Sequence, residues 1–510
     1  MDTGERKVKT RVIVVGAGPV GLTLAGELRL GGVDVVVYDK LPAPSGESRA
    51  LGFTKRVAEL FDQRGLLTRL GDFNWGQQSH FGGLRIDLDA LDEEHHGVRG
   101  LPQSRTEEML ANWLSELGVP VRRGYEAVGF RETQDGVTVV FEGPQGRHEE
   151  SAGYLVGCDG GGSTIRTAAG IEAPGWEATR GMYMADITGA EVNQRPIGER
   201  VPGGNMVLSI SLGDGYYRIL IHDKSLRPRP DSEALTFAEV ADAWQRMTGE
   251  SLHHAQPRWM AAFSNAAGLA AEYRRGRVFL AGDAAHNTPP LAGWGLAVGI
   301  QDAVNLGWKL AAVIGGSAPE GLLDSYHTER YPLGQQLMRN THAGSMLYLS
   351  GEEMEPLREV MRELVDYKAA AGHLAGMVSG LSVRYDMGSG EHPLLGMRMP
   401  PECEVELPDG GRTRVAELLH QARGVFISTG GDGEAERLAA GWSDRVDVVT
   451  GSWAPAAEGR PARTLPDAVL VRPDGYIAWA APGGGDLCEA LGRWFGSARA
   501  AVDSPAAALS

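Results

Sequence analysis

The sequence has few cysteines, and none of them forms a functional pattern. Cys158, Cys403 and Cys488 are the three in the chain, and they lie far apart. There is no CxxC pair, no even-numbered disulfide framework and no Cys/His spacing suited to zinc. The histidine pairs at 95–96 and 253–254 lack a third ligand at metal spacing, so we expect exposed loop histidines there. The sequence predicts reduced thiols in a cytoplasmic protein and no metal site.

Positive charge is also scarce, since 49 Lys and Arg stand against 66 Asp and Glu, a net charge of −17. Nucleic acids and anionic lipids both require a basic face, so we expect neither a nucleic acid nor a membrane as a partner. Met1 to Lys9 is polar and has no apolar segment of a secretory signal. The most apolar long stretch, Gly295 to Gly316, is interrupted by polar residues, which suits a buried helix better than a membrane span.

A dinucleotide fingerprint is present near the start of the chain. A β-branched run leads into Gly16, Gly18 and Gly21, a helical pattern follows, and a second β-branched run ends at Asp39. In such a turn the glycines allow a tight bend, close approach to a pyrophosphate and close helix–strand packing, and the acid accepts hydrogen bonds from a ribose. A glycine-rich turn without a ligand is the alternative, because Gly is abundant (71 residues). The flanking strands and helix favour dinucleotide binding.

Two later segments carry related signals. Val278 to His286 (VFLAGDAAH) ends a buried-strand pattern, and Pro289-Pro290, Gly293 and Gly295 follow before a long helix. The glycines permit close backbone approach, and the helix directs its positive N-terminal end at whatever binds there. The other segment is 157–160 (GCDG), with Ser163 and Arg166 after it. An Asp-Gly pair alone is an ordinary turn.

These segments resemble the class A flavoprotein monooxygenases, the para-hydroxybenzoate hydroxylase family. Within it the stretch GDAAHNTPPLAGWGLAVGIQDAVNLGWKLA is similar to the aromatic polyketide hydroxylases. The resemblance implies an α/β fold with a discontinuous Rossmann-like FAD-binding domain of that type, with a helical extension, at 1–181 and 264–390. It further implies a β-sheet substrate domain at 182–263 and a C-terminal thioredoxin-like α/β domain at 391–510. The last lacks CxxC, so packing or oligomer contact is its expected role rather than disulfide exchange.

The resemblance also implies a set of cofactor contacts. Asp283 would hold the ribityl chain of FAD, residues 290–296 would lie along the isoalloxazine ring, and Asp159 would serve both FAD and a transient nicotinamide. The family often has Asn where this chain has Ala297, so one side-chain contact near the flavin is missing. The residues expected to contact FAD are Gly16, Gly18, Pro19, Val20, Gly21, Asp39, Lys40, Arg49, Gln103, Asp159, Gly160, Asp283, Pro290, Gly293, Gly295, Leu296 and Ala297.

The function that the resemblance implies is hydroxylation of an aromatic substrate, a polycyclic polyketide, through a flavin C4a-hydroperoxide. Non-covalent FAD would be the cofactor, NADPH or NADH the transient reductant and O2 the oxidant. Residues 182–263 and 289–294 are expected to border the substrate, and no catalytic side chain is identified. Baeyer–Villiger oxygen insertion and a flavin-binding protein that is not an oxygenase remain alternatives. The chain is expected to be a monomer or a homodimer.

Overall fold

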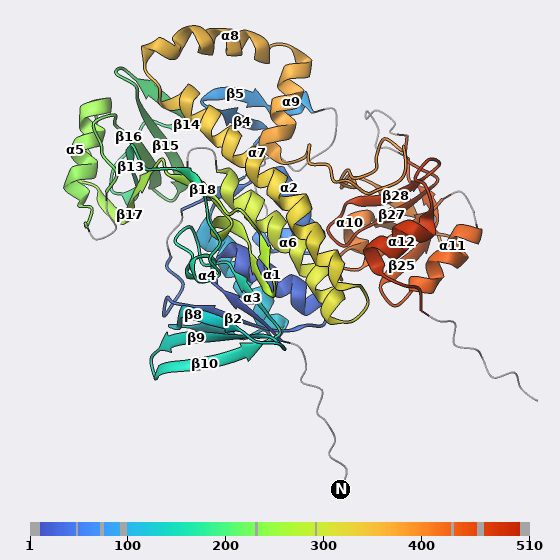
Figure 1. Ribbon diagram of the computed structural model, residues 1–510. Helices are drawn as coiled ribbons and strands as arrows, with labels where there is room; N and C mark the ends of the chain where they lie inside the picture. The colour runs from blue at the N-terminus through green and yellow to red at the C-terminus, as the bar shows by residue number, and fades with distance from the viewer. Residues whose placement is uncertain are drawn as a thin grey trace, which may run out of the picture.

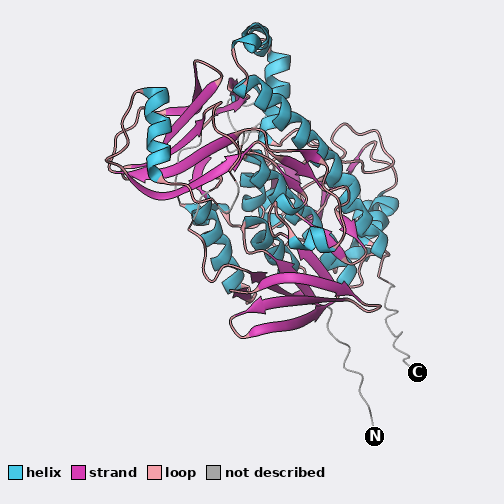
Figure 2. Cartoon of the chain, turned by 60° about the vertical axis from the view of Figure 1, so that its left-hand side comes forward, coloured by secondary structure: helices cyan, strands magenta, loops and turns pink. Residues whose placement is uncertain are grey.

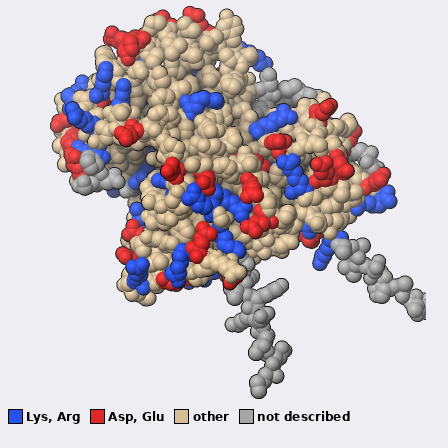
Figure 3. Space-filling model, viewed as in Figure 1, with Lys and Arg blue, Asp and Glu red and all other residues tan. Residues whose placement is uncertain are grey.

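The structure is a computed structural model that describes residues 11–46, 49–71, 76–91, 99–229, 233–290, 293–429, 433–455 and 464–499. In Figure 1 a central α/β unit carries a second sheet on one side and a C-terminal unit on the other. The viewed face in Figure 3 mixes acidic and basic side chains. None of the helices within the described ranges is long and apolar enough to cross a membrane.

The central sheet has the strand order β19-β20-β11-β1-β2-β7. Its strands pair in parallel except for β19, which is antiparallel to β20. Short apolar runs that are largely buried explain the four inner strands, as expected for a parallel sheet covered by helices. The edge strands β19 and β7 contain Arg and are less buried. The strands are β19 Arg274–Arg275, β20 Val278–Leu280, β11 Tyr154–Gly157, β1 Arg11–Val15, β2 Asp34–Asp39 and β7 Val121–Arg123.

Because β1, β2, β11 and β20 run in parallel, the segments after their carboxyl ends meet at one edge of the sheet. That edge brings together Gly16, Asp39, Asp159 and Asp283, which lie far apart in the sequence. Helices α1 (Pro19–Leu30), α3 (Gln103–Glu116) and α6 (Trp294–Ile314) pack in this unit, with α1 between the other two. The predicted strand–turn–helix–strand at the start of the chain is confirmed.

Small antiparallel sheets surround the central one. A three-stranded sheet of β8, β9 and β10 lies at the bottom of Figures 1 and 2. The two-stranded pair β3–β6, the hairpin β4–β5 and the sheet β12-β18-β21 complete this unit. The bounds are β8 Glu126–Glu132, β9 Val137–Gly143, β10 Gly146–Ala152, β3 Leu51–Phe53, β6 Arg99–Pro102, β4 Gln78–Phe81, β5 Leu84–Asp87, β12 Gly175–Trp176, β18 Ala267–Leu269, β21 His286–Asn287, α2 Lys55–Asp62 and α4 Thr164–Ala168.

A five-stranded antiparallel sheet of order β14-β15-β16-β13-β17 forms the second unit. Its outer face packs against α5, and its inner face turns toward the rest of the molecule (Figures 1 and 2). We propose this unit as the substrate domain at 182–263. The bounds are β14 Arg195–Val201, β15 Asn205–Gly213, β16 Tyr216–His222, β13 Gly181–Thr188, β17 Gln256–Ser264 and α5 Phe237–Thr248.

The helical extension expected within 264–390 contains three α-helices after α6. They are α7 Asp324–Leu349, α8 Glu355–Val365 and α9 Lys368–Ser379. The backbone leaves the helical conformation at Ser350, which is extended, and again at Tyr367. The side chain of Arg358 fixes the first break, because it donates hydrogen bonds to the carbonyl oxygens of Leu347, Ser350 and Gly351 at the end of α7.

The C-terminal unit has a four-stranded sheet of order β25-β24-β27-β28. β24 is parallel to β25 and antiparallel to β27, which is in turn antiparallel to β28, a thioredoxin-like arrangement as expected. The bounds are β24 Gly424–Ser428, β25 Val446–Thr450, β27 Ala468–Val471, β28 Ile477–Ala481, β22 Glu404–Glu406, β23 Arg412–Arg414, β26 Ser452–Trp453, α10 Val415–Leu418, α11 Gly433–Ala439 and α12 Leu487–Phe495.

Candidate cofactor site

The first glycine turn joins β1 to α1, and two of its three glycines are closely packed against neighbouring backbone. Gly16 has φ +108°, and a Cβ there would overlap the carbonyl of Cys158. A Cβ on Gly21 would overlap the carbonyl of Gly16. A Cβ on Gly18, in contrast, would meet nothing within 4 Å. The first and third glycines are therefore required by the fold itself, whereas the second borders open space, where a ligand can approach the backbone.

The N-terminus of α1 lacks a protein cap. Gly18 is the N-cap residue, no side chain caps the helix and no acid lies in its first turn. Pro19 occupies a first-turn position and is buried, while Val20 packs its side chain against Gly282 and Gly299. Free backbone N–H groups and the helix dipole make such an end suited to a phosphate.

Asp39 ends β2 beside this turn. Its Oδ2 accepts a hydrogen bond from the backbone N–H of Ala17 (2.7 Å) and its Oδ1 accepts one from that of Leu41 (2.8 Å). Arg123 lies 3.8 Å from Oδ1. The carboxylate is thus held rigidly next to the glycine turn, and each oxygen keeps a second lone pair for a ligand hydroxyl. Lys40 is exposed.

Asp159 follows β11 and organises its own turn. Its Oδ1 accepts a hydrogen bond from the Ser163 hydroxyl (2.5 Å), and its Oδ2 accepts one from the backbone N–H of Ile165 (3.1 Å). Arg166 donates to the carbonyl oxygens of Gly161 and Ala284, both at 2.9 Å. Arg166 therefore ties the second motif to the third. Gly160 has φ +82° and borders open space.

Asp283 follows β20 at the same edge of the sheet and lies next to the start of α6. Its side chain is exposed. Desolvation by the surrounding protein raises the pKa of its carboxyl group, and the charges of His286 and Arg49 oppose this rise. A Cβ on Gly295 would lie 3.7 Å from Asp283 Oδ1, so this carboxylate and the first turn of α6 are direct neighbours.

The N-terminus of α6, like that of α1, begins at a glycine and has no capping side chain. Gly293 is its N-cap with φ +68°, it borders open space, and neither a capping side chain nor an acid is present in the first turn. The side chains of Thr236, Asp486 and Ser163 cap α5, α12 and α4, whereas α2, α3 and α9 are also uncapped but do not begin at a glycine. Pro290, Gly295 and Leu296 are half-buried, and Ala297 is buried. Of the expected ring-facing loop, Leu291 and Ala292 lie outside the described residues.

Gln103 and Arg49 approach the Asp283 segment from another part of the chain. Gln103 is the first residue of α3; its Oε1 accepts a hydrogen bond from the Ala50 backbone (3.1 Å) and its amide donates to Glu107 (2.7 Å). Arg49 is exposed and stabilises the Asp283 carboxylate through space. Ser48, which precedes it, lies outside the described residues.

A buried polar network behind Asp283 was not predicted from the sequence. Asp302 on α6 accepts hydrogen bonds from the Gly282 backbone (3.2 Å) and from Arg330 Nε (2.7 Å), and its Oδ2 lies 2.6 Å from His286 Nε2. Arg330 continues to the Tyr385 hydroxyl (2.8 Å). Asp302, His286 and Arg330 have no exposed side-chain surface. The network fixes both ends of the Gly282–His286 loop and thus the position of Asp283.

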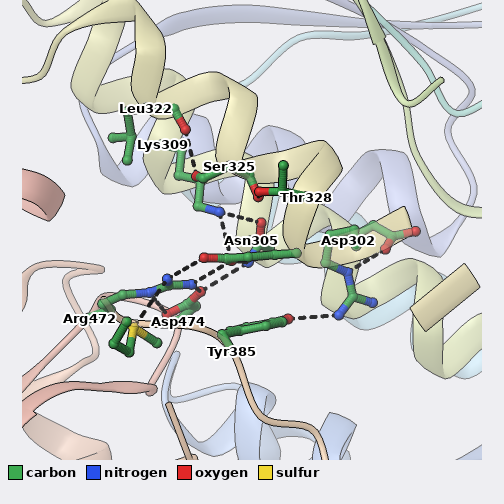
Figure 4. A network of polar contacts seen from close by, with 12 residues as sticks. Asp302, Asn305, Lys309, Leu322, Ser325, Thr328, Tyr385, Arg472 and Asp474 are labelled. Atoms are coloured by element: carbon green, nitrogen blue, oxygen red, sulfur yellow. Dashed lines mark hydrogen bonds and ion pairs between the residues drawn. The ribbon is translucent and has the colours of Figure 1, made fainter. Parts of the chain in front are cut away.

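A second buried network joins the central unit to the C-terminal unit (Figure 4). Arg472 donates to both oxygens of Glu329 (2.6 and 2.9 Å) and pairs with Asp474. Lys309 donates to Asn305 and to Glu329, each at 2.8 Å. Arg64 adds a bridge, because it pairs with Glu27 in the central unit and donates to the carbonyl oxygens of Leu419 and Pro473. The two units are therefore joined by buried charges.

The histidines and cysteines of the described residues do not form a metal site. No group of three or more His, Cys, Asp or Glu in the described part of the chain could hold a metal ion. His253 and His254 are exposed, and His253 lies 3.2 Å from Asp242, whereas the pair 95–96 lies outside the described residues. Burial raises the pKa of the Cys158 thiol well above its usual value, which suits a structural residue.

Comparisons with known proteins agree with this arrangement. The FAD binding domain family matches residues 9–341, and the family described as aromatic-ring hydroxylase, C-terminal, matches residues 392–498. A 12-dehydrotetracycline 5-monooxygenase/anhydrotetracycline 6-monooxygenase of Streptomyces rimosus is 40% identical over 95% of this chain and 98% of its own length. A rifampicin monooxygenase of Streptomyces venezuelae is 39% identical over 96% of this chain and 99% of its own length.

Among solved structures, CabE, an aromatic hydroxylase from angucycline biosynthesis, superimposes with a TM-score of 0.91. It is 51% identical to this chain, and the match covers 96% of this chain and all of CabE. The matches include the cofactor-binding unit, the sheet unit and the C-terminal unit. The chain belongs to the family of FAD-dependent aromatic-ring hydroxylases.

Proposed function

We propose that this chain is a monooxygenase that uses FAD, NADPH and O2 to hydroxylate a polycyclic aromatic polyketide of phenolic or quinoid type. The observation that carries the proposal is the pair of uncapped helix N-termini, α1 and α6, both opening at Gly residues that border open space. An adenine–flavin dinucleotide has a pyrophosphate for one such end and an electron-rich ring for the other. Among the similar solved structures, CabE is named as an aromatic hydroxylase, which favours hydroxylation over Baeyer–Villiger insertion.

The residues present fit FAD. Gly18 and the α1 N-terminus would meet the pyrophosphate, and Asp39 would accept hydrogen bonds from the adenosine ribose. Asp283, beside the first turn of α6, would face the ribityl hydroxyl groups, with Arg49 and Gln103 on the flavin side. The full set that we propose for FAD is Gly16, Gly18, Pro19, Val20, Gly21, Asp39, Lys40, Arg49, Gln103, Asp159, Gly160, Asp283, Pro290, Gly293, Gly295, Leu296 and Ala297.

Bound FAD would supply hydride acceptance and oxygen activation. The protein's own contribution is position and electrostatics. The α6 N-terminus places partial positive charge where a reduced, anionic ring would lie, and the buried Asp302 network keeps the Asp283 loop in place. The inner face of the β13–β17 sheet and residues 289–294 would enclose the substrate and exclude water.

The test begins with the purified protein, which should be yellow and release FAD on denaturation. NADPH oxidation and O2 uptake should rise severalfold when polycyclic phenols such as 2-hydroxyanthraquinone are added. NMR of the product skeleton would then distinguish ring hydroxylation from ring expansion. A colourless protein that takes up no FAD would refute the proposal, and a yellow protein inert to NADPH with every phenol tested would favour a flavin-binding protein that is not an oxygenase.

A further inference from the structure

The inner face of the β13–β17 sheet is built from three cross-strand rows. The strand register places the residues of each row side by side on β15, β16, β13 and β17. Alternation along each strand puts these residues opposite the α5 face. The rows are Met206-His222-Met182-Phe263, Leu208-Leu220-Met184-Ala261 and Ile210-Arg218-Asp186-Trp259.

The first two rows are largely apolar, and Tyr348 and Leu349 of α7 pack against them. The third row is different, because it holds a charged pair and an indole. Ile210 and Trp259 in that row are only half-buried, so protein does not fully cover this end of the face. β15 also contacts β6, which pairs with β3 next to the Arg49–Ala50 segment. The face therefore adjoins the proposed flavin site.

Arg218 and Asp186 form a bidentate ion pair. Arg218 Nε and Nη2 donate to the two oxygens of Asp186, each at 2.7 Å. Its guanidinium group lies over the Trp259 ring, 5.4 Å from the centroid. Two donors of this trio lack an acceptor within the described structure, Arg218 Nη1 and Trp259 Nε1, and both nitrogen atoms are buried. Arg218 itself is only 2% exposed.

The outer face of the same sheet carries a matched trio in which every donor is used. Arg195 lies over Trp244, 5.5 Å from its centroid, and pairs with Glu250. Its Nε donates to Glu199, its Nη1 to the Asn193 carbonyl and its Nη2 to Glu250. The indole N–H of Trp244 donates to the second Glu250 oxygen at 3.2 Å. In the outer trio, therefore, each donor nitrogen of Arg195 and Trp244 has an acceptor within the protein.

Unsatisfied donors of the inner trio carry a free-energy cost that the fold does not recover. A buried N–H without an acceptor costs about 1–3 kcal/mol, and more when it belongs to a charged group that cannot lose its proton. Trp259 lies on an edge strand and is half-buried, so its ring can shift to admit an oxygen atom beside Arg218. The missing acceptor is therefore best supplied by a ligand.

We propose that Arg218 and Trp259 bind a phenolate or quinone oxygen of the aromatic substrate. The inference rests on the proposed function and deepens it, since it assigns the polar end of the substrate site. Asp186 orients Arg218 through its two hydrogen bonds and leaves Nη1 for the ligand. The apolar rows beside it contact the flat ring system of the substrate, and the two N–H donors set which of its edges points into the sheet.

The test measures binding to the FAD-loaded protein at neutral pH rather than turnover. The probes are 2-hydroxyanthraquinone and 2-methoxyanthraquinone, which share a ring system and differ only in whether the oxygen can ionise. Flavin fluorescence and absorbance report the dissociation constants, and the long-wavelength band of the phenolate reports the bound form of the hydroxy compound. The unsubstituted protein should favour the hydroxy compound by about tenfold or more, as expected for hydrogen bonds from a charged donor.

Two variants at the site and one control separate binding from structural support. Trp259→Phe keeps an aromatic ring but removes the indole N–H, so the preference for the hydroxy compound should fall about fivefold. The double variant Asp186→Asn with Arg218→Gln keeps an internal hydrogen bond and removes the charge, so the phenolate band of the bound probe should disappear. Trp244→Phe, which removes the matching N–H on the outer face, should leave the preference unchanged.

The proposal is overturned if the unsubstituted protein binds both probes equally or binds neither, or if the two site variants keep the full preference. FAD content and NADPH oxidation are measured on the same samples. A yellow, NADPH-oxidising protein without the preference would refute the role of Arg218 and Trp259 and leave the proposed function intact, whereas a colourless protein would refute both.

Discussion

The glycines of the first turn make the sharpest prediction, because two of them serve the fold and one serves a ligand. Gly18 has φ −78° and ψ 179°, which any residue can adopt, and a Cβ there meets nothing within 4 Å. Gly18→Ala should therefore change the stability of the FAD-free protein by about 1 kcal/mol or less. A Cβ on Gly21 would overlap the carbonyl of Gly16, so Gly21→Ala should destabilise the FAD-free protein by about 1–3 kcal/mol or more.

Although Gly18→Ala should hardly change stability, it should weaken FAD binding. If the pyrophosphate approaches the backbone at Gly18, the added methyl group occupies its space, and overpacking of about 1–3 kcal/mol corresponds to a fivefold to more than hundredfold rise in the FAD dissociation constant. FAD is removed, thermal unfolding is followed without it, and FAD is then titrated back by the quenching of its fluorescence. A Gly18→Ala protein that binds FAD as tightly as the unsubstituted one would refute this position of the pyrophosphate.

Three further predictions concern buried charges. Glu329→Gln removes one of the two carboxylates that pair with Arg472, and it should lower the free energy of unfolding, measured by urea titration, by about 3–5 kcal/mol. The control Glu149→Gln, at an exposed ion pair, should leave the urea midpoint unchanged. Burial alone would raise the pKa of Glu329, but its cationic partners hold it below its usual 4.5. Its contribution is therefore complete above about pH 4.5 and is lost as the pH falls further, so the unfolding free energy of Glu329→Gln should depend less on pH in that acid range; an equal dependence would contradict this. Asp302→Asn leaves Arg330 without its carboxylate partner and loosens the Asp283 loop, so both the melting temperature and the FAD affinity should fall. An unchanged FAD affinity would show that the Asp302 network does not position Asp283 for FAD.

The sequence predicted the parts of the site that depend on backbone geometry. Gly16 and Gly293 both have positive φ, and glycine is the residue that adopts this conformation without strain, so their positions are visible in the sequence. The sequence also indicated the strands rich in Val and Ile and the helix after Gly295. In these segments the local conformational propensity of the residues and their burial in the fold favour the same structure.

The charged networks were not predicted, because each depends on residues brought together only by the fold. Glu329 and Arg472 are 143 positions apart, and Asp186 and Arg218 are 32 apart. A weaker signal did exist for the second pair. Each of its members interrupts an otherwise apolar strand, and a charge buried in such a strand requires a partner. The partner's identity follows only from the strand register, which the sequence does not specify.

Helix α6 contacts the proposed flavin site, the Asp302 network and the network around Arg472. Its uncapped N-terminus lies at the proposed flavin site, Asp302 in its middle holds the Asp283 loop, and Asn305 and Lys309 join the network that contains Arg472. From Trp294 to Lys309 the helix rises about 22 Å, so a rigid α-helix links the proposed flavin site to the C-terminal unit. Buried ion pairs tolerate little displacement, because a broken pair leaves an uncompensated charge. The C-terminal unit, although it has no CxxC, therefore helps to fix the helix end that would face the flavin.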